Sequence, residues 1–421
     1  MEDALKIRLF LHSIITIYLC LYISPVESSP EIISRFQQYL QINTAHPNPK
    51  YYESAEFLIS QAKSLNLEHE TLEFVKGKPL VLLKWTGKNP NLPAILLNSH
   101  TDVVPAEHHK WNHSPFDANV DEAGDIYARG SQDMKCVGLQ YLEAIRRLKG
   151  SGFQPIPTVY LSFVPDEEIG GHDGLPSPDE NYRIFYAEKC AWWLTIKATG
   201  LPGHGAKLYD NSAMENLLKS IESARRFRAS QFDLVKAGLM AEGEVVSVNM
   251  VFLKAGTPTP TGFVMNLQPS EAEAGFDVRV PPTADPISLE KRISEEWAPS
   301  SRNMTFEFKQ QGYNFEKKFV TATDNSNPWW KLLEGAVEKA NGKIGKPEIF
   351  PASTDARYFR KQGLPAIGFS PMINTPVLLH DHNEFLNQDE YLKGIAVYES
   401  IIKEYTSYIE LTDNEASRDE L

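Results

Sequence analysis

Four short stretches of this chain carry residue types that hold metal ions. In the first, His100 and Asp102 follow an apolar run of strand length, and alternate residues of an extended chain point the same way. An imidazole and a carboxylate on one face can form a metal ligand and the group that orients it. A surface loop would explain this pair equally well, because His-x-Asp alone is a weak signal.

The next two stretches supply carboxylates. Asp133 lies at the start of a predicted helix, close to Gly130, where it could serve as the helix N-cap or could bridge two cations. Glu167 and Glu168 follow another apolar strand, and open α/β sheets bind ligands at such strand ends. Adjacent carboxylates fit a solvated acidic loop, or a metal site in which one binds the ion and the other takes a proton from water.

The fourth stretch places His380 and His382 on alternate positions after an apolar run. Taken singly, either could be an ordinary surface histidine. The four stretches together predict a metal site.

The elements that must position these residues alternate between helical and strand-like patterns. From about residue 30 to 188 the pattern predicts an α/β unit with a buried, largely parallel sheet. Helices are expected at 32–42, 54–65 and after Asp133, and strands at 80–85, 94–99, 158–164 and 183–186.

Between residues 191 and 310 the order changes to strand, helix, strand, strand, helix, strand, which indicates a separate α+β module of ferredoxin-like type. The expected elements are 192–198, 214–227, 245–254, 272–280, 287–296 and 304–309. The α/β pattern then resumes at 329–340, 366–370 and 388–405, so the outer domain is discontinuous.

Bulk properties exclude some functions. The 421 residues carry a formal net charge of −13 and no basic stripe, which argues against nucleic acid as a partner. Apart from Cys20 in the leader there are only Cys136 and Cys190, so no disulfide framework is expected. Two buried free thiols are the simpler interpretation, and a single bridge is the alternative.

Both ends of the chain carry targeting patterns. Residues 1–28 resemble a signal peptide, with Lys6 and Arg8 before an apolar run at 9–23; a retained signal anchor is the alternative. Residues 412–421 form an acidic tail whose end, Arg418-Asp419-Glu420-Leu421, matches a luminal retention signal. We therefore expect the endoplasmic reticulum lumen, with no membrane attachment after cleavage; the sequons at Asn112 and Asn303 are compatible with it.

In their order and context, these stretches resemble the metal-site motifs of the aminoacylase-1 family, a group of co-catalytic zinc metallopeptidases. The resemblance covers nearly the whole mature chain. It rests on His100-Thr101-Asp102, on residues 128–135 and 165–171, on Val377-Leu378-Leu379-His380-Asp381-His382 and on residues 324–330.

The resemblance implies a zinc-peptidase-like α/β/α catalytic domain (29–190 and 311–411) with an inserted ferredoxin-like lid and dimerisation domain (191–310). It implies two zinc ions held by His100, Asp133, Glu168 and His380, with Asp133 bridging. Asp102 would orient His100, and Glu167 would be the general base and then the acid. Substrate contacts would come from Asn266, Arg279, Arg357 and, in a homodimer, His204 of the neighbouring subunit.

The sequence departs from the family in one place. The family's fifth metal ligand lies on a strand reached through a helix after the paired glutamates, and the 23 residues between Glu168 and Trp192 leave no room for both. Asp173, Asp179 and Glu180 are poor substitutes because a loop does not fix a carboxylate as a strand does. We expect one zinc to bind weakly or not at all; the alternative is that the sequence is a shortened isoform or an imperfect gene model. The missing strand should also expose its apolar neighbours.

The resemblance implies hydrolysis of N-acyl-L-amino acids to a carboxylate and a free amino acid. A dipeptidase would use the same residues, as would a hydrolase of long-chain acyl amino acids. A catalytically impaired luminal protein that binds or dimerises is the alternative from outside the enzyme class.

Overall fold

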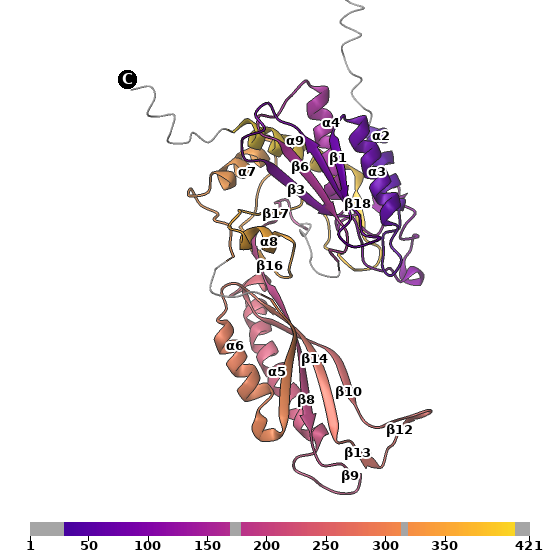
Figure 1. Cartoon of the computed structure of the whole chain (residues 1–421), viewed down its shortest axis with the longest axis vertical. Coiled ribbons are helices and arrows are strands. Elements are labelled where there is room, and N and C mark those ends of the chain that lie inside the picture. Colours follow the sequence, from indigo (N-terminus) through magenta and orange to yellow (C-terminus); the bar gives the residue numbers. More distant parts are fainter. Residues whose placement is uncertain (1–28, 169–177, 313–318, 409–421) are drawn as a thin grey trace, which may run out of the picture.

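The computed structural model describes residues 29–168, 178–312 and 319–408, which form two parts (Figure 1). One part contains the helices and strands from both ends of the described chain. The other is an elongated sheet with helices along one side. The predicted signal peptide, the predicted retention signal and Asp173 lie outside the described residues. No helix in the described ranges is long and apolar enough to cross a membrane.

The first part is built on a four-stranded sheet whose order is β1-β2-β6-β3. Only β3 and β6 pair in parallel; the other two pairings are antiparallel, so the expectation of a largely parallel sheet is wrong. β1 and β2 form a hairpin, which needs only a short connection, whereas β2 and β6 are distant in the sequence and their antiparallel pairing is set by the fold. The bounds are β1 (Glu68–Leu72), β2 (Leu80–Trp85), β3 (Ile95–His100) and β6 (Val159–Val164).

Helices cover this sheet through an aliphatic and aromatic core. Along α4, apolar side chains recur at helical spacing, and Val137, Tyr141, Ile145 and Leu148 are all buried. The same core includes the last long helix and the two helices nearest the N-terminus. The bounds are α2 (Ser29–Gln41), α3 (Tyr51–Ser64), α4 (Lys135–Gly150), α7 (Pro328–Lys339) and α9 (Gln388–Ser407).

A second sheet of three strands, β16-β7-β17, lies beyond β3. Within the described residues, no strand pairs with the outer edge of β3, and an apolar groove of about 490 Å³ lies between β3 and β17. This agrees with a strand missing from the short segment before Trp192. The bounds are β7 (Ile184–Glu188), β16 (Glu348–Phe350), β17 (Gly368–Phe369) and the neighbouring α8 (Ala356–Lys361).

A third, small sheet brings the C-terminal motif to the earlier ones. Its order is β18-β5-β4, and Phe385 of β18 lies opposite Tyr127 of β5 in antiparallel register. This pairing ties the segment that carries His380 to the segment that leads to Asp133. The bounds are β4 (Asn119–Val120), β5 (Asp125–Tyr127) and β18 (Phe385–Asn387).

The second part is an antiparallel sheet of order β10-β14-β8-β15 with two helices packed on it. Trp192 of β8 and Trp297 are fully buried in its own core. The strands are β8 (Cys190–Thr199), β10 (Ser247–Ala255), β14 (Glu271–Val280) and β15 (Met304–Gln311), and the helices are α5 (Ala213–Lys236) and α6 (Pro286–Arg292), the latter continued by a π turn at Ile293–Trp297. The strand and helix order predicted for this region is the order observed.

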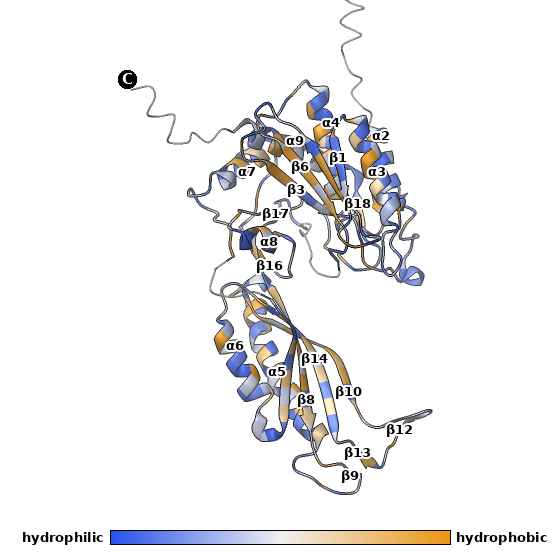
Figure 2. Cartoon of the chain, in the orientation of Figure 1, coloured by the Kyte–Doolittle hydropathy of each residue, from blue (hydrophilic) through white to orange (hydrophobic). Residues whose placement is uncertain are grey.

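Short strand pairings extend the sheet at the end away from the first part (Figure 1). One is a true hairpin of β11 (Pro258–Thr259) with β12 (Gly262–Phe263), and the other is a two-stranded pairing of β9 (Gly203–His204) with β13 (Leu267–Gln268), which are distant in the sequence. Apolar residues along β10 and toward β12 lie on the surface (Figure 2). Short 3₁₀ turns occur at His108–Lys110, Glu242–Glu244 and Ser300–Arg302. Cys136 and Cys190 are both buried and free, which confirms the simpler interpretation of the two thiols.

Candidate metal centre

His100 is the last residue of β3 and lies opposite Val164, the last residue of β6. The two strands are parallel, so their carboxyl ends meet at one edge of the sheet, and the loop after β6 delivers Glu167 and Glu168 beside His100. His100 and Glu167 are buried although both can ionise. Buried groups of this kind are held in place only by partners of opposite charge or by metal ions.

Asp133 reaches the same place from the loop before α4. That helix begins at Lys135 and its N-cap residue is Met134, so the alternative of Asp133 as an N-cap is wrong. The buried carboxylate of Glu384 holds the loop instead: it accepts hydrogen bonds from the backbone N–H groups of Gly130 (3.2 Å), Gln132 (2.7 Å) and Asp133 (3.3 Å). Arg129 pairs with the same carboxylate at 2.7 Å.

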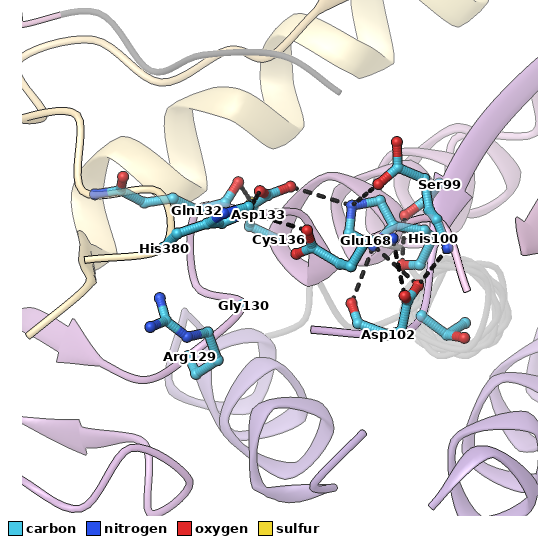
Figure 3. A network of polar contacts seen from close by, with 12 residues as sticks. Ser99, His100, Asp102, Arg129, Gly130, Gln132, Asp133, Cys136, Glu168 and His380 are labelled. Atoms are coloured by element: carbon cyan, nitrogen blue, oxygen red, sulfur yellow. Dashed lines mark hydrogen bonds and ion pairs between the residues drawn. The ribbon is translucent and has the colours of Figure 1, made fainter. Parts of the chain in front are cut away.

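The four expected metal ligands converge (Figure 3). Oδ1 of Asp133 lies 3.1 Å from Nε2 of His100, and Oδ2 lies 3.4 Å from Nε2 of His380. Oε2 of Glu168 lies 3.0 Å from the same nitrogen of His380. The two oxygens of Asp133 therefore face two different histidines, which is the arrangement of a bridging carboxylate.

The donor set fits a divalent transition metal. Ligand atoms of His100, Asp133 and Glu168 lie within 4.8 Å of one another, and His380 contacts two of these residues. Imidazole nitrogens together with carboxylate oxygens, and no thiolate, suit a divalent cation such as those of the first transition row. His382 is not part of the cluster; its Nε2 lies 3.5 Å from Glu107.

Asp102 links the histidine to the glutamates. Its backbone oxygen lies 3.0 Å from Nδ1 of His100, and its carboxylate lies 3.5 Å from the same nitrogen. The carboxylate also accepts the backbone N–H groups of Glu167 (3.0 Å) and Glu168 (2.9 Å). Asp102 thus fixes the imidazole of His100 and the loop of Glu167 and Glu168 together.

Asp102 also belongs to a second group of possible metal ligands. The other members of this group are His46 and Asp166. Asp166 already pairs with Lys78 and accepts a hydrogen bond from the hydroxyl of Tyr51 at 2.6 Å. The Lys78 ammonium supplies the positive charge that a cation would bring. We assign this group to support of the loop rather than to metal binding.

The carboxylates around the two histidines favour the protonated imidazoles. Burial alone would lower the pKa of His100, but the carboxylates of Asp102 and Asp133 raise it well above its usual value. Burial alone would also lower the pKa of His380, but the carboxylates of Asp133 and Glu168 raise it to about 10. A metal ion must displace these protons, so metal binding weakens as the pH falls.

The expected substrate residues are not all in the same place. His204 and Asn266 lie together at the far tip of the second part, where the backbone N–H of Gly205 donates to the carbonyl of Asn266 at 2.8 Å. This tip is far from the metal centre of the same chain (Figure 1). Arg279 lies near the other end of β14 and pairs with Asp277 at 2.8 Å.

Arg357 lies on α8, where its guanidinium donates to the carbonyl of Thr354 at 2.9 Å and stacks on Tyr358. Burial raises the pKa of the neighbouring Asp355, while the charge of His100 acts in the opposite direction. Arg357 therefore lies two positions after a carboxylate that is close enough to His100 to feel its charge. Asp179 and Glu180 are exposed and belong to neither of the two metal groups, so the described carboxylates of that loop do not replace the missing ligand.

Sequence reasoning missed the residues that support the centre. Glu384 and Arg129 lie within or beside the quoted motifs, but nothing in their spacing shows that they pair over 255 positions. Tyr51 and Lys78 lie outside every motif. For Asp166, the available signal was its position next to the paired glutamates.

Comparison with known proteins agrees with this geometry. Residues 96–404 match the model of peptidase family M20/M25/M40. Aminoacylase-1 of Mus musculus is 42% identical over 404 residues, covering 90% of this chain and 97% of that protein. A tripeptidase from Staphylococcus aureus has a similar fold, with a TM-score of 0.69, 16% identity and coverage of 90% of this chain and 99% of the other.

A dinuclear metal-binding peptidase of Bacillus subtilis from the M20 family has a TM-score of 0.61 at 15% identity, covering 90% of this chain and 99% of the other. At such identities the two solved structures support the fold alone. The expectation of a zinc-peptidase-like α/β fold is confirmed.

Proposed function

Because the chain belongs to peptidase family M20/M25/M40 and shares 42% identity with an aminoacylase-1, we propose that it hydrolyses N-acyl-L-amino acids with the help of bound metal. The products are a carboxylic acid and a free L-amino acid. The observation that carries the proposal is the convergence of His100, Asp133, Glu168 and His380 on one place at the end of β3 and β6.

The metal we propose is zinc, with two ions of unequal affinity. Asp133 can serve both positions because its two oxygens face different histidines. One position is completed by Glu168 and His380. The other has only His100 besides Asp133 among the described residues, so it should lose its ion first. Bound zinc supplies a Lewis acid for the amide carbonyl and lowers the pKa of water.

Glu167 moves the proton. Its Oε2 lies 3.9 Å from Nε2 of His100, so the carboxylate borders the proposed metal site. It takes a proton from the attacking water and delivers it to the departing amine nitrogen. Asp102 keeps it in position through the N–H of Glu167, since a base must lie within hydrogen-bond reach of the proton it abstracts.

The substrate carboxylate is proposed to bind Arg357, whose planar guanidinium suits a bidentate contact. His204, Asn266 and Arg279 are proposed to complete the site. The exposed position of His204 at the distal tip supports a role in the neighbouring subunit of a homodimer. Four consecutive apolar residues of β10, from Met250 to Leu253, are exposed, and an apolar strand surface of this kind supports dimerisation through the second part.

The compartment we propose is the endoplasmic reticulum lumen. It rests on the signal-peptide pattern at 1–28 and on the sequence Arg418-Asp419-Glu420-Leu421. The domain division at 190 and 310, with a lid between two parts of a catalytic domain, is proposed on the separate cores of the two parts. The four-donor cluster does not favour a catalytically impaired protein.

The decisive variant is Glu167→Ala. We expect it to keep the metal content of the native protein and to lose N-acetylmethionine hydrolysis by at least about a hundredfold. Metal is measured by elemental analysis and hydrolysis by release of free methionine. Glu180→Ala, an exposed glutamate outside the cluster, is the control. Unchanged hydrolysis by Glu167→Ala, or native protein that retains no metal, would refute the proposal.

A further inference from the structure

The apolar groove between β3 and β17 has no role in the reaction described above. Its volume is about 490 Å³, in the range of small-molecule sites, and no residue that lines it carries a formal charge. The α9 residues Tyr398, Ile401, Ile402 and Tyr405 line one side at helical spacing. Residues 93–98, which lead into and include most of β3, line a second side of the groove, and residues 364–370, which include β17, line a third.

The groove meets the edge of β3 rather than one of its faces. Side chains alternate between the two faces of a strand, yet every residue from 93 to 98 lines the groove. The N–H groups of Ile95 and Thr101 bond toward β6, to Thr158 at 3.0 Å and Val164 at 2.8 Å. In a parallel ladder the alternate residues, Leu96 and Asn98, direct their backbone groups the other way, toward the groove.

Tyrosine hydroxyls already occupy part of these edges. Tyr141 donates to the carbonyl of Asn98 at 3.2 Å, and Tyr398 donates to the carbonyl of Phe369 on β17 at 2.8 Å. Tyr405 bonds the carbonyl of Trp329, and Thr406 bonds that of Ile402. The walls therefore present ring faces and aliphatic carbons, with their hydroxyls turned to the protein.

One end of the groove adjoins the proposed active site. Its lining residue Asn98 is two positions before His100 on β3, and Met134 directly follows Asp133. Ala356, on the opposite wall, directly precedes Arg357. A substrate whose carboxylate binds Arg357 and whose amide lies at the metal centre thus has this apolar space beside it.

We propose that the groove binds the acyl chain of the substrate, and that long unbranched acyl groups are the preferred class. This inference rests on the proposed function and specifies its substrate. An acyl chain needs apolar contact and no hydrogen bonds, which is what these walls offer. An added peptide strand is the weaker candidate, because it requires edge carbonyls that Tyr141 and Tyr398 already contact.

The test is a chain-length series on zinc-loaded protein. We compare N-acetyl-, N-hexanoyl- and N-dodecanoylmethionine by kcat/KM, and we measure the Kd of free dodecanoate by calorimetry. Each methylene buried from water should raise kcat/KM about fourfold until the groove is filled. A flat or falling series overturns the inference.

Two variants place a carboxylate at the groove wall. Leu96 and Leu364 both line the groove and are 41% and 54% exposed, so Leu96→Asp and Leu364→Asp are expected to fold. Each should lower the ratio of dodecanoyl to acetyl hydrolysis at least about tenfold. Leu239→Asp, at a leucine of the second part that is 72% exposed, should leave the ratio unchanged. An unchanged ratio in both groove variants overturns the inference.

The outcomes separate this inference from the proposed function. Hydrolysis of N-acetylmethionine without a chain-length effect leaves the proposed function intact and overturns the acyl groove. If no substrate is hydrolysed, the proposed function fails, and dodecanoate still decides: binding that Leu96→Asp weakens supports the groove, and no binding overturns it. Displacement of bound dodecanoate by a valine-rich pentapeptide at comparable concentration overturns it in favour of strand addition.

Discussion

The metal centre and the distal tip of the second part both hold histidines implicated in the reaction, but they are built differently. Around His100 the ionisable groups are buried and are fixed by one another. At the tip, His204 and Asn266 are exposed, and the imidazole of His204 contacts its own loop: its Nδ1 accepts the N–H of Ala206 at 3.1 Å. The candidate metal centre is preorganised within one chain, whereas the tip lies far from that centre and joins the proposed reaction only through a neighbouring subunit.

The largest expected effect tests this difference at the tip. If His204 polarises the substrate of the neighbouring subunit, His204→Ala lowers kcat about a hundredfold to a thousandfold, because a donor to the developing oxyanion is lost. Metal content and thermal stability should not change, since the side chain is exposed. Steady-state kinetics and elemental analysis give both readouts.

Mixing variants shows whether the histidine acts between subunits. A co-refolded equimolar mixture of His204→Ala and Glu167→Ala chains should regain about a quarter of native activity, because half of the subunits pair in mixed dimers and one of their two sites is intact. The separate variants remain inactive. A mixture that gains nothing would place His204 outside the partner's site.

The next effect concerns the buried support of Asp133. In Arg129→Met the Glu384 carboxylate loses its counter-ion while both groups are almost completely buried. We expect a loss of about 3–5 kcal/mol in unfolding free energy and a tenfold to hundredfold weaker metal affinity. Denaturant unfolding and zinc titration measure the two quantities.

An exposed ion pair of the second part is the matched control. Arg292 and Glu296 lie 2.8 Å apart, one helical turn from each other, and both side chains are well exposed. Arg292→Met should change the free energy of unfolding by less than about 0.5 kcal/mol, because solvent screens such pairs. Equal losses in the two variants would contradict the contrast between the regions.

A smaller effect is expected at the loop behind Asp102. The hydroxyl of Tyr51 donates to Asp166 at 2.6 Å and accepts its N–H at 3.2 Å, next to the general base. Tyr51→Phe removes both bonds, so we expect a loss of about 1 kcal/mol in stability and a severalfold lower kcat with KM unchanged. The neighbouring Tyr52 is exposed and bonds Glu73, so Tyr52→Phe should have no effect on kcat. A rise in KM alone would argue that Tyr51 contacts substrate rather than positioning Glu167.

Sequence alone predicts the ligands better than their surroundings. His100, Asp133, Glu168 and His380 follow from local motifs, and most helices and strands follow from the periodicity of apolar residues. The pairing of Glu384 with Arg129 depends on the antiparallel contact of β18 with β5, which no local pattern contains. The sheet was expected to be largely parallel because apolar runs look alike in parallel and antiparallel strands, and only the short turns among its strands distinguish them.

The smallest effect is expected at Lys189, where the first part of the structure joins the second. Lys189 precedes β8 and is fully buried, and this burial lowers the pKa of its ammonium to about 8, while Glu242 acts to raise it. Between pH 8 and 9 the unfolded lysine binds more protons than the folded one, so its contribution to the free energy of unfolding rises with pH, by up to about 1 kcal/mol. From about pH 8 upward the thiol of Cys190, whose pKa burial raises to about 12, acts in the opposite direction because the unfolded thiol loses its proton first. The native protein and a variant at Lys189 share this contribution, so it cancels in their difference. The free energy of unfolding of the native protein minus that of Lys189→Met, both measured with denaturant, should therefore grow by up to about 1 kcal/mol from pH 8 to 9. Lys254→Met, on the exposed strand β10, should show no such growth. A constant difference for Lys189→Met would mean that water reaches the junction and that it resembles the exposed tip rather than the buried metal centre.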